Sequence, residues 1–84
     1  MATKTFKIGE YAVGGIIQVR TTTNSVNIDS LDWNTKEKFM GREFLMGGRN
    51  ILNDMDVYLN EITSSYYADQ VLNYIKENLN PKSL

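Results

Sequence analysis

The spacing of the apolar residues changes at Gly47-Gly48, and this change constrains the fold more than any other feature of the chain. Before these glycines, apolar and polar residues alternate with a period of two, which is typical of half-buried strands. After them, apolar residues recur every three or four positions, which is typical of amphipathic helices. With 84 residues, the chain makes one small domain, residues 1–84. We therefore predict an α+β fold in which strands precede helices.

Three or four antiparallel strands, connected as a β-meander, are predicted within residues 3–46. They are expected near residues 3–8, 16–21, 25–28 and 38–46. Gly14-Gly15 is predicted to form a two-residue hairpin turn, because a type I′ turn needs positive φ at both central positions. A shift in the alternation at Gly9 predicts a β-bulge or a tight turn, and a second shift at Asp29-Ser30 predicts a β-bulge. The last strand has large apolar side chains on both faces, so we expect both faces to be covered.

Two C-terminal helices, near 49–62 and 65–79, are predicted to pack on one face of the sheet. Their apolar stripes consist of Ile51, Leu52, Met55, Tyr58, Leu59 and Ile62, and of Ala68, Val71, Leu72, Ile75 and Leu79. At about 100° per residue the two stripes point roughly 200° apart, so one straight helix would direct them to opposite sides. A break is expected at Thr63-Ser64-Ser65, whose hydroxyls are natural N-caps. Asn80-Pro81 is expected to end the second helix.

The chain contains no cysteine and no histidine. Disulfides and thiolate metal sites are therefore excluded, and the commonest general base is missing. The acidic residues Asp29, Asp32, Asp54 and Asp56 are candidates for binding Mg²⁺ or for acid–base chemistry. However, Asp54 and Asp56 are two positions apart on a helix and do not face each other. We therefore interpret these carboxylates as solvated charges and predict no catalytic residue, no metal site and no cofactor.

The net charge is −1, but the charges are unevenly distributed along the chain. Residues 1–49 carry seven basic and five acidic side chains, which gives +2, and residues 50–84 carry two basic and five acidic ones, which gives −3. Ordinary solvated faces are one interpretation, and two surfaces of opposite sign that steer a partner are the other. A nucleic-acid partner is not expected from this balance. The sheet residues considered for such a partner are Lys7, Arg20, Lys38, Arg42, Phe6 and Trp33.

The N-terminal residues lack an apolar leader segment, and no stretch approaches the ~18 apolar residues of a membrane span. We therefore expect a cytoplasmic protein with no membrane partner. A domain of this size buries only about 60–65% of its extended surface, so its stability margin is small. Small domains without disulfides or metals often gain stability by association. This favours a homo-oligomer, with a homodimer as the simplest case.

Gly47-Gly48 precedes a predicted helix and is followed by Arg49 and Asn50. Backbone N–H groups at a helix N-terminus carry partial positive charge, and glycines allow an anion to approach them closely. Arg49 adds a bidentate donor, and Arg42 is expected nearby on the preceding strand. The pattern indicates a site for a phosphorylated or nucleotide-like molecule, formed by Gly47, Gly48, Arg49, Asn50 and Arg42. Alternatively, the glycine pair only turns the chain from sheet to helix.

Aromatic side chains make up 11% of the residues. Tyrosine and tryptophan combine an apolar body with a polar group, which favours interfaces. Tyr66 and Tyr67 are consecutive at a helix start and cannot share one face, so one of them is expected outside the core. The predicted interface residues are Trp33, Tyr58, Tyr66, Tyr67 and Tyr74, with core filling as the alternative.

These patterns favour a small non-enzymatic interaction protein that acts through protein–protein contacts as a homo-oligomer. In size, lack of motifs and asparagine-rich composition it is similar in kind to small accessory proteins of phages and other mobile elements, although the resemblance covers no specific residue. The resemblance implies an inhibitor of host machinery, such as an anti-defence protein. The alternative function is the binding of a phosphorylated or nucleotide-like molecule at Gly47-Gly48-Arg49-Asn50.

Overall fold

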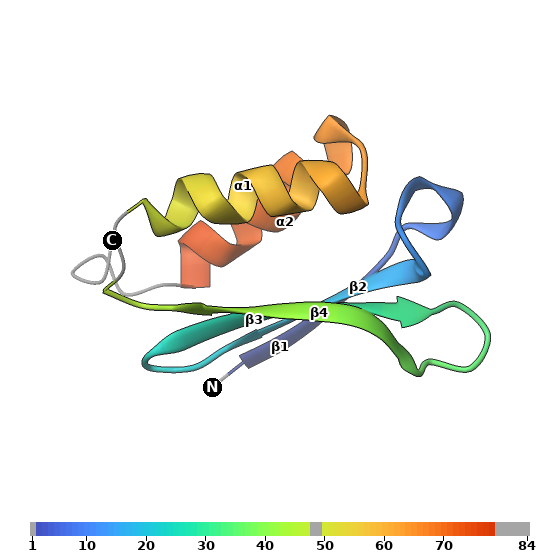
Figure 1. The fold of residues 1–84 in the computed structure, drawn as a ribbon, viewed down its shortest axis with the longest axis horizontal. Helices are drawn as coiled ribbons and strands as arrows, with labels where there is room; N and C mark the ends of the chain where they lie inside the picture. The colour runs from blue at the N-terminus through green and yellow to red at the C-terminus, as the bar shows by residue number, and fades with distance from the viewer. Residues whose placement is uncertain (1, 48–49, 79–84) are drawn as a thin grey trace.

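A computed structural model describes residues 2–47 and 50–78, and its elements follow the predicted order of strands and then helices (Figure 1). The strands are β1 (Ala2–Lys7), β2 (Gly15–Thr21), β3 (Ser25–Asp32) and β4 (Lys38–Leu45). A short 3-10 turn, η1 (Gly9–Tyr11), lies between β1 and β2. The helices are α1 (Ile51–Ile62) and α2 (Ser65–Asn78). The structure confirms the α+β fold.

The four strands form one antiparallel sheet in the order β1-β2-β3-β4, as expected for a meander. Both helices lie on the same side of this sheet (Figure 1). Phe44 of β4 packs against Tyr58 of α1, with ring centroids 5.7 Å apart. Phe6 of β1 packs against Tyr74 of α2 at the same distance. These contacts place α1 over β4 and α2 over β1.

The core lies between the sheet and the helices, and it consists of the predicted apolar stripes up to residue 78 together with one face of the strands. Leu79 and the expected helix end at Asn80-Pro81 lie outside the described residues. The strand residues on this helix-side face that are buried in the core are Ile17, Val19, Val26, Ile28 and Phe44. Met55, Leu59, Val71 and Ile75 are fully buried on the helices. Two polar atoms, the hydroxyls of Ser30 and Tyr58, are buried here without a hydrogen-bond partner. Neither helix in the described part of the chain is long and apolar enough to cross a membrane.

The prediction of a two-residue turn at Gly14-Gly15 is wrong. Residues 8–14 form a longer connection that contains η1, and it is closed by a hydrogen bond from Ile8 N–H to Gly15 O of 3.0 Å. At Gly9, where a bulge or a tight turn was expected, the chain forms the 3-10 turn. The connection leaves the sheet because Val13 N–H donates to Ile62 O at the end of α1, at 2.9 Å. A tertiary contact therefore overrides the local turn preference.

The prediction of a bulge at Asp29-Ser30 is also wrong in its position. β3 pairs with β2 in unbroken register from Val26 to Asp32, and the irregularity lies in the pairing with β4. Ser30 is opposite Met40 and Leu31 is opposite Lys38, so Phe39 is the extra residue. The apolar Leu31 falls on the helix-free face, where it is opposite the buried Ile16. A small apolar cluster on that face explains the change in alternation without a bulge in β3.

The expectation that β4 is covered on both faces is not met by the described residues. Its residues Phe39 and Leu45 are each 64% exposed. Only the face that carries Phe44 packs against a helix.

Candidate functional site

The connection between β1 and β2 is attached to the junction of α1 and α2. Besides the bond from Val13 to Ile62, the hydroxyl of Thr63 donates to Tyr11 O, and Ala12 and Thr63 form an isolated antiparallel bridge. Within the connection, Ala12 N–H donates to Gly9 O at 3.2 Å. This end of the sheet therefore has a defined backbone shape that is supported by the helix layer.

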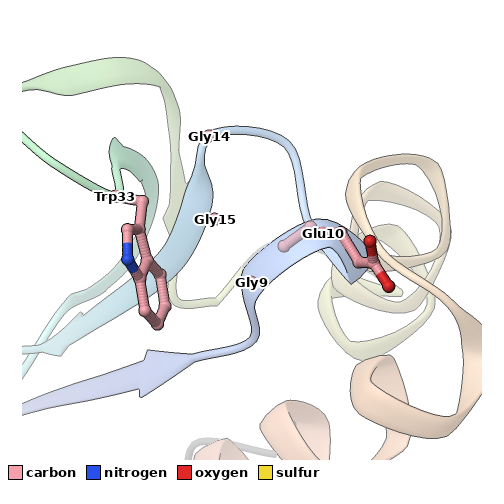
Figure 2. A pocket seen from close by; sticks show the side chains of 6 residues that line it. Gly9, Glu10, Gly14, Gly15 and Trp33 are labelled. Carbon is pink, nitrogen blue, oxygen red and sulfur yellow. The ribbon is translucent and has the colours of Figure 1, made fainter.

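A pocket of about 410 Å³ opens on this connection and is lined by Gly9, Glu10, Ala12, Gly14, Gly15 and Trp33. Figure 2 shows the Trp33 indole along one wall, with the Glu10 carboxylate turned away from it. Gly15 has φ of +98°, and a Cβ built there would lie 3.0 Å from Trp33 Cβ. Its lack of a side chain lets the indole approach the backbone closely. The pocket is therefore shallow, with a glycine floor and one aromatic wall.

A hydrogen-bonded turn presents Trp33 at the end of β3. The Asp32 carboxylate accepts hydrogen bonds from Asn34 N–H at 2.8 Å and from Thr35 N–H at 2.9 Å. These bonds, first that from Thr35 and then that from Asn34, lower the pKa of Asp32 below its ordinary value. The Lys36 ammonium donates to Trp33 O and lies 5.7 Å from the indole centroid. These hydrogen bonds hold the turn in one conformation, and the Trp33 side chain on it is 45% exposed.

Three tyrosines extend the aromatic surface on the helix side of the connection. Tyr67 lies between Tyr11, at a ring-centroid distance of 5.4 Å, and Tyr66, at 5.0 Å. Tyr67 is half-buried, whereas Tyr11 is 54% and Tyr66 is 70% exposed. We call Tyr11, Trp33, Tyr66 and Tyr67 the aromatic end. Its members come from the β1–β2 connection, the β3–β4 turn and the first turn of α2.

The structure thus brings three of the predicted interface residues, Trp33, Tyr66 and Tyr67, to one end of the molecule. Tyr58 lies in the core, 6% exposed, and burial is the main reason that its pKa is raised. Tyr74 is half-buried against Phe6. Sequence reasoning did not identify Tyr11 as a site residue, although its position between Gly9 and Gly14-Gly15 is a signal for an exposed loop residue.

The predicted anion site is only partly described. Gly48 and Arg49 lie outside the described residues, Gly47 has φ of +88°, and Asn50 adopts a left-handed conformation just before α1. Arg42 stacks on Phe44, at 4.7 Å from the ring centroid, and lies 6.0 Å from that of Tyr58. Tyr58 lies about two helical turns beyond the start of α1, so Arg42 faces the middle of the helix. The anion site stays a prediction.

The candidate acidic residues are dispersed. Asp29 forms an ion pair with Arg20 at 3.5 Å, and Asp32 holds the Trp33 turn. Asp54 and Asp56 lie on α1. Among the described residues, no group of three potential metal-binding side chains occurs.

Comparison of the chain with protein-family models, with curated proteins and with solved structures found no match.

Proposed function

We propose that this protein is a non-enzymatic binding module that recognises another protein through its aromatic end. The proposal rests on one observation: Tyr11, Trp33 and Tyr66 come from three separate segments and are exposed together around one connection. Rings of this type contribute most of the binding energy in many protein interfaces. Exposure of these apolar rings to water is unfavourable, and a partner that covers them removes this apolar surface from water.

The rigidity of the supporting backbone favours this role. The Trp33 turn and the β1–β2 connection are each held by several hydrogen bonds, so little conformational entropy would be lost on binding. The pocket beside Trp33 is open, whereas sites for small molecules enclose most of their ligand. A glycine floor with one aromatic wall suits an apolar side chain inserted from a partner surface.

Site-specific photo-crosslinking in cells of the source organism tests this proposal. A photoreactive phenylalanine analogue is placed at Trp33 or Tyr66, and at Val57 as a control that is 51% exposed on α1. We expect the same partner protein to be crosslinked from both aromatic positions and not from position 57. With the purified partner, Trp33→Ala and Tyr66→Ala should each weaken binding at least tenfold, whereas Val57→Ala should not.

Equal crosslinking from all three positions would contradict the proposal, because it would indicate contact by chance. Crosslinking only to a second copy of this chain would also contradict it, because the aromatic end would then be a self-association surface.

A further inference from the structure

The outer edge of β4 carries peptide groups that have no partner strand among the described residues. Met46 N–H donates to Asn24 O at 2.8 Å, and Asn24 and Met46 are the next opposed pair after Ser25 and Leu45. Opposed pairs of an antiparallel ladder alternate between bonded and non-bonded, so the even-numbered residues of β4 bond to β3. The odd-numbered residues Gly41, Glu43 and Leu45 therefore direct their N–H and C=O groups away from the sheet.

The same edge exposes apolar side chains. Phe39 and Leu45 are each 64% exposed and Met40 is 38% exposed, so β4 exposes three large apolar side chains. The opposite edge of the sheet, β1, exposes Lys4 and Lys7 and no large apolar side chain. A long edge with exposed apolar residues is a template for pairing with another strand.

The charges of β4 distinguish three registers near the middle of the strand for pairing with a second copy. In an antiparallel two-fold pair, directly opposed residues share a face, so the axis passes through a residue. An axis at Arg42 would oppose the two Arg42 side chains, and an axis at Glu43 would oppose the two Glu43 side chains. An axis at Gly41 opposes Arg42 to Met40 and Glu43 to the Phe39 bulge and its neighbour Lys38. It also brings together the two Asp29 carboxylates that lie over Gly41, each with a Lys38 side chain beside it.

The position of Lys38 strengthens this register. Lys38 is opposite Leu31 on the helix-free face, and a Cβ built at Gly41 would lie 3.4 Å from Lys38 Cδ. The Lys38 side chain therefore lies along β4 beside the proposed axis, on the face that carries Glu43. Each copy would provide one Glu43 and one Lys38, which makes two reciprocal ion pairs.

We propose that two copies of this chain associate through antiparallel β4–β4 pairing centred on Gly41, which joins the two sheets into one. Pairing would satisfy the free peptide groups and cover Met40 and Phe39. No member of the aromatic end lies on β4, so this inference does not depend on the proposed function.

Charge reversal tests the association by analytical ultracentrifugation of the full chain. We expect a concentration-dependent dimer, and we expect Glu43→Lys or Lys38→Glu to weaken it at least tenfold, because each change creates like-charge pairs on both sides of the axis. The double variant should recover most of the affinity. The matched control Glu77→Lys, an exposed change on α2, should leave it unchanged. A strict monomer at millimolar concentration, or a double variant no better than the single ones, would overturn the proposal.

Cysteine crosslinking tests the register, and the natural chain has no cysteine to interfere. Met40 and Arg42 of the second copy would form a non-bonded pair with Cα atoms about 4.5 Å apart, within disulfide range. We expect a mixture of Met40→Cys and Arg42→Cys chains to give one crosslinked heterodimer on mild oxidation. Circular dichroism confirms folding. Efficient crosslinking of either variant with itself would overturn the Gly41-centred register.

Discussion

The carboxylate of Asp29 lies directly over Gly41 on the helix-free face of the sheet. The two residues are opposed across β3 and β4, and a Cβ at position 41 would overlap Asp29 Oδ1. Asp29 is 6% exposed and forms an ion pair with Arg20. Gly41 is therefore the residue that allows a carboxylate to be buried at this point of the sheet.

We expect Gly41→Ala to lower the free energy of unfolding by about 1–3 kcal/mol, because the new methyl group displaces the Asp29 side chain. Urea unfolding followed by circular dichroism measures this change. In the Asp29→Ala background the same substitution should cost clearly less, because the obstructing carboxylate is gone. Equal costs in both backgrounds would show that the overlap with Asp29 is not the cause.

The stability of the fold should decrease in alkaline solution because of Tyr58. Burial raises the pKa of Tyr58 above the ordinary value of 10.0, the negative charge of Asp29 raises it further, and Arg42 partly offsets this. Above pH 10 the unfolded chain therefore loses this proton before the folded chain does, and the free energy of unfolding falls as the pH rises.

Tyr58→Phe should make this alkaline decrease shallower, as measured by urea unfolding between pH 9 and about pH 11. Tyr66→Phe is the matched control, because Tyr66 is 70% exposed, and its profile should follow the natural protein. Parallel profiles for all three proteins would contradict the assignment.

The Trp33 turn should weaken in acid. The pKa of Asp32 is lowered by the bonds from Thr35 and Asn34, so its contribution to stability is present above the ordinary value of 3.8 and is lost as the pH falls below it. Asp32→Asn should therefore flatten the acid limb of the stability curve. Asp69→Asn, an exposed change on α2, should leave it steep. Trp33 fluorescence provides a local readout of the same transition.

The attachment of the β1–β2 connection to the helices should depend on one hydroxyl. Thr63→Val keeps the shape of the side chain but removes the donor to Tyr11 O, so we expect a loss of about 1 kcal/mol. Hydrogen exchange should accelerate at Val13 N–H, which bonds to Ile62 O. Thr5→Val, on exposed β1, should not change exchange at Val13. Unchanged exchange in Thr63→Val would show that the hydroxyl does not hold the connection.

Much of the architecture was predictable because it depends on local periodicity. The stripe that includes Met55 and Leu59 forms the buried side of α1, and the break near Thr63 separates the two helices as expected. The position of the β-bulge between β3 and β4 could not be predicted in the same way. Leu31 leaves the apolar alternation of β3 because it packs with Ile16 on the second face, and a one-dimensional pattern cannot distinguish that from a slip in register.

The amino-acid sequence by itself determined which segments become strands and helices and which side of each is apolar, because backbone geometry repeats every two or about 3.6 residues. The tertiary structure alone decided that Tyr11 meets Tyr67, that Trp33 faces the glycines of the β1–β2 connection and that Asp29 covers Gly41. These contacts join segments far apart in the chain, such as Thr63 and Tyr11, which are 52 positions apart. Such pairings depend on how the layers pack, and packing depends on all the elements at once.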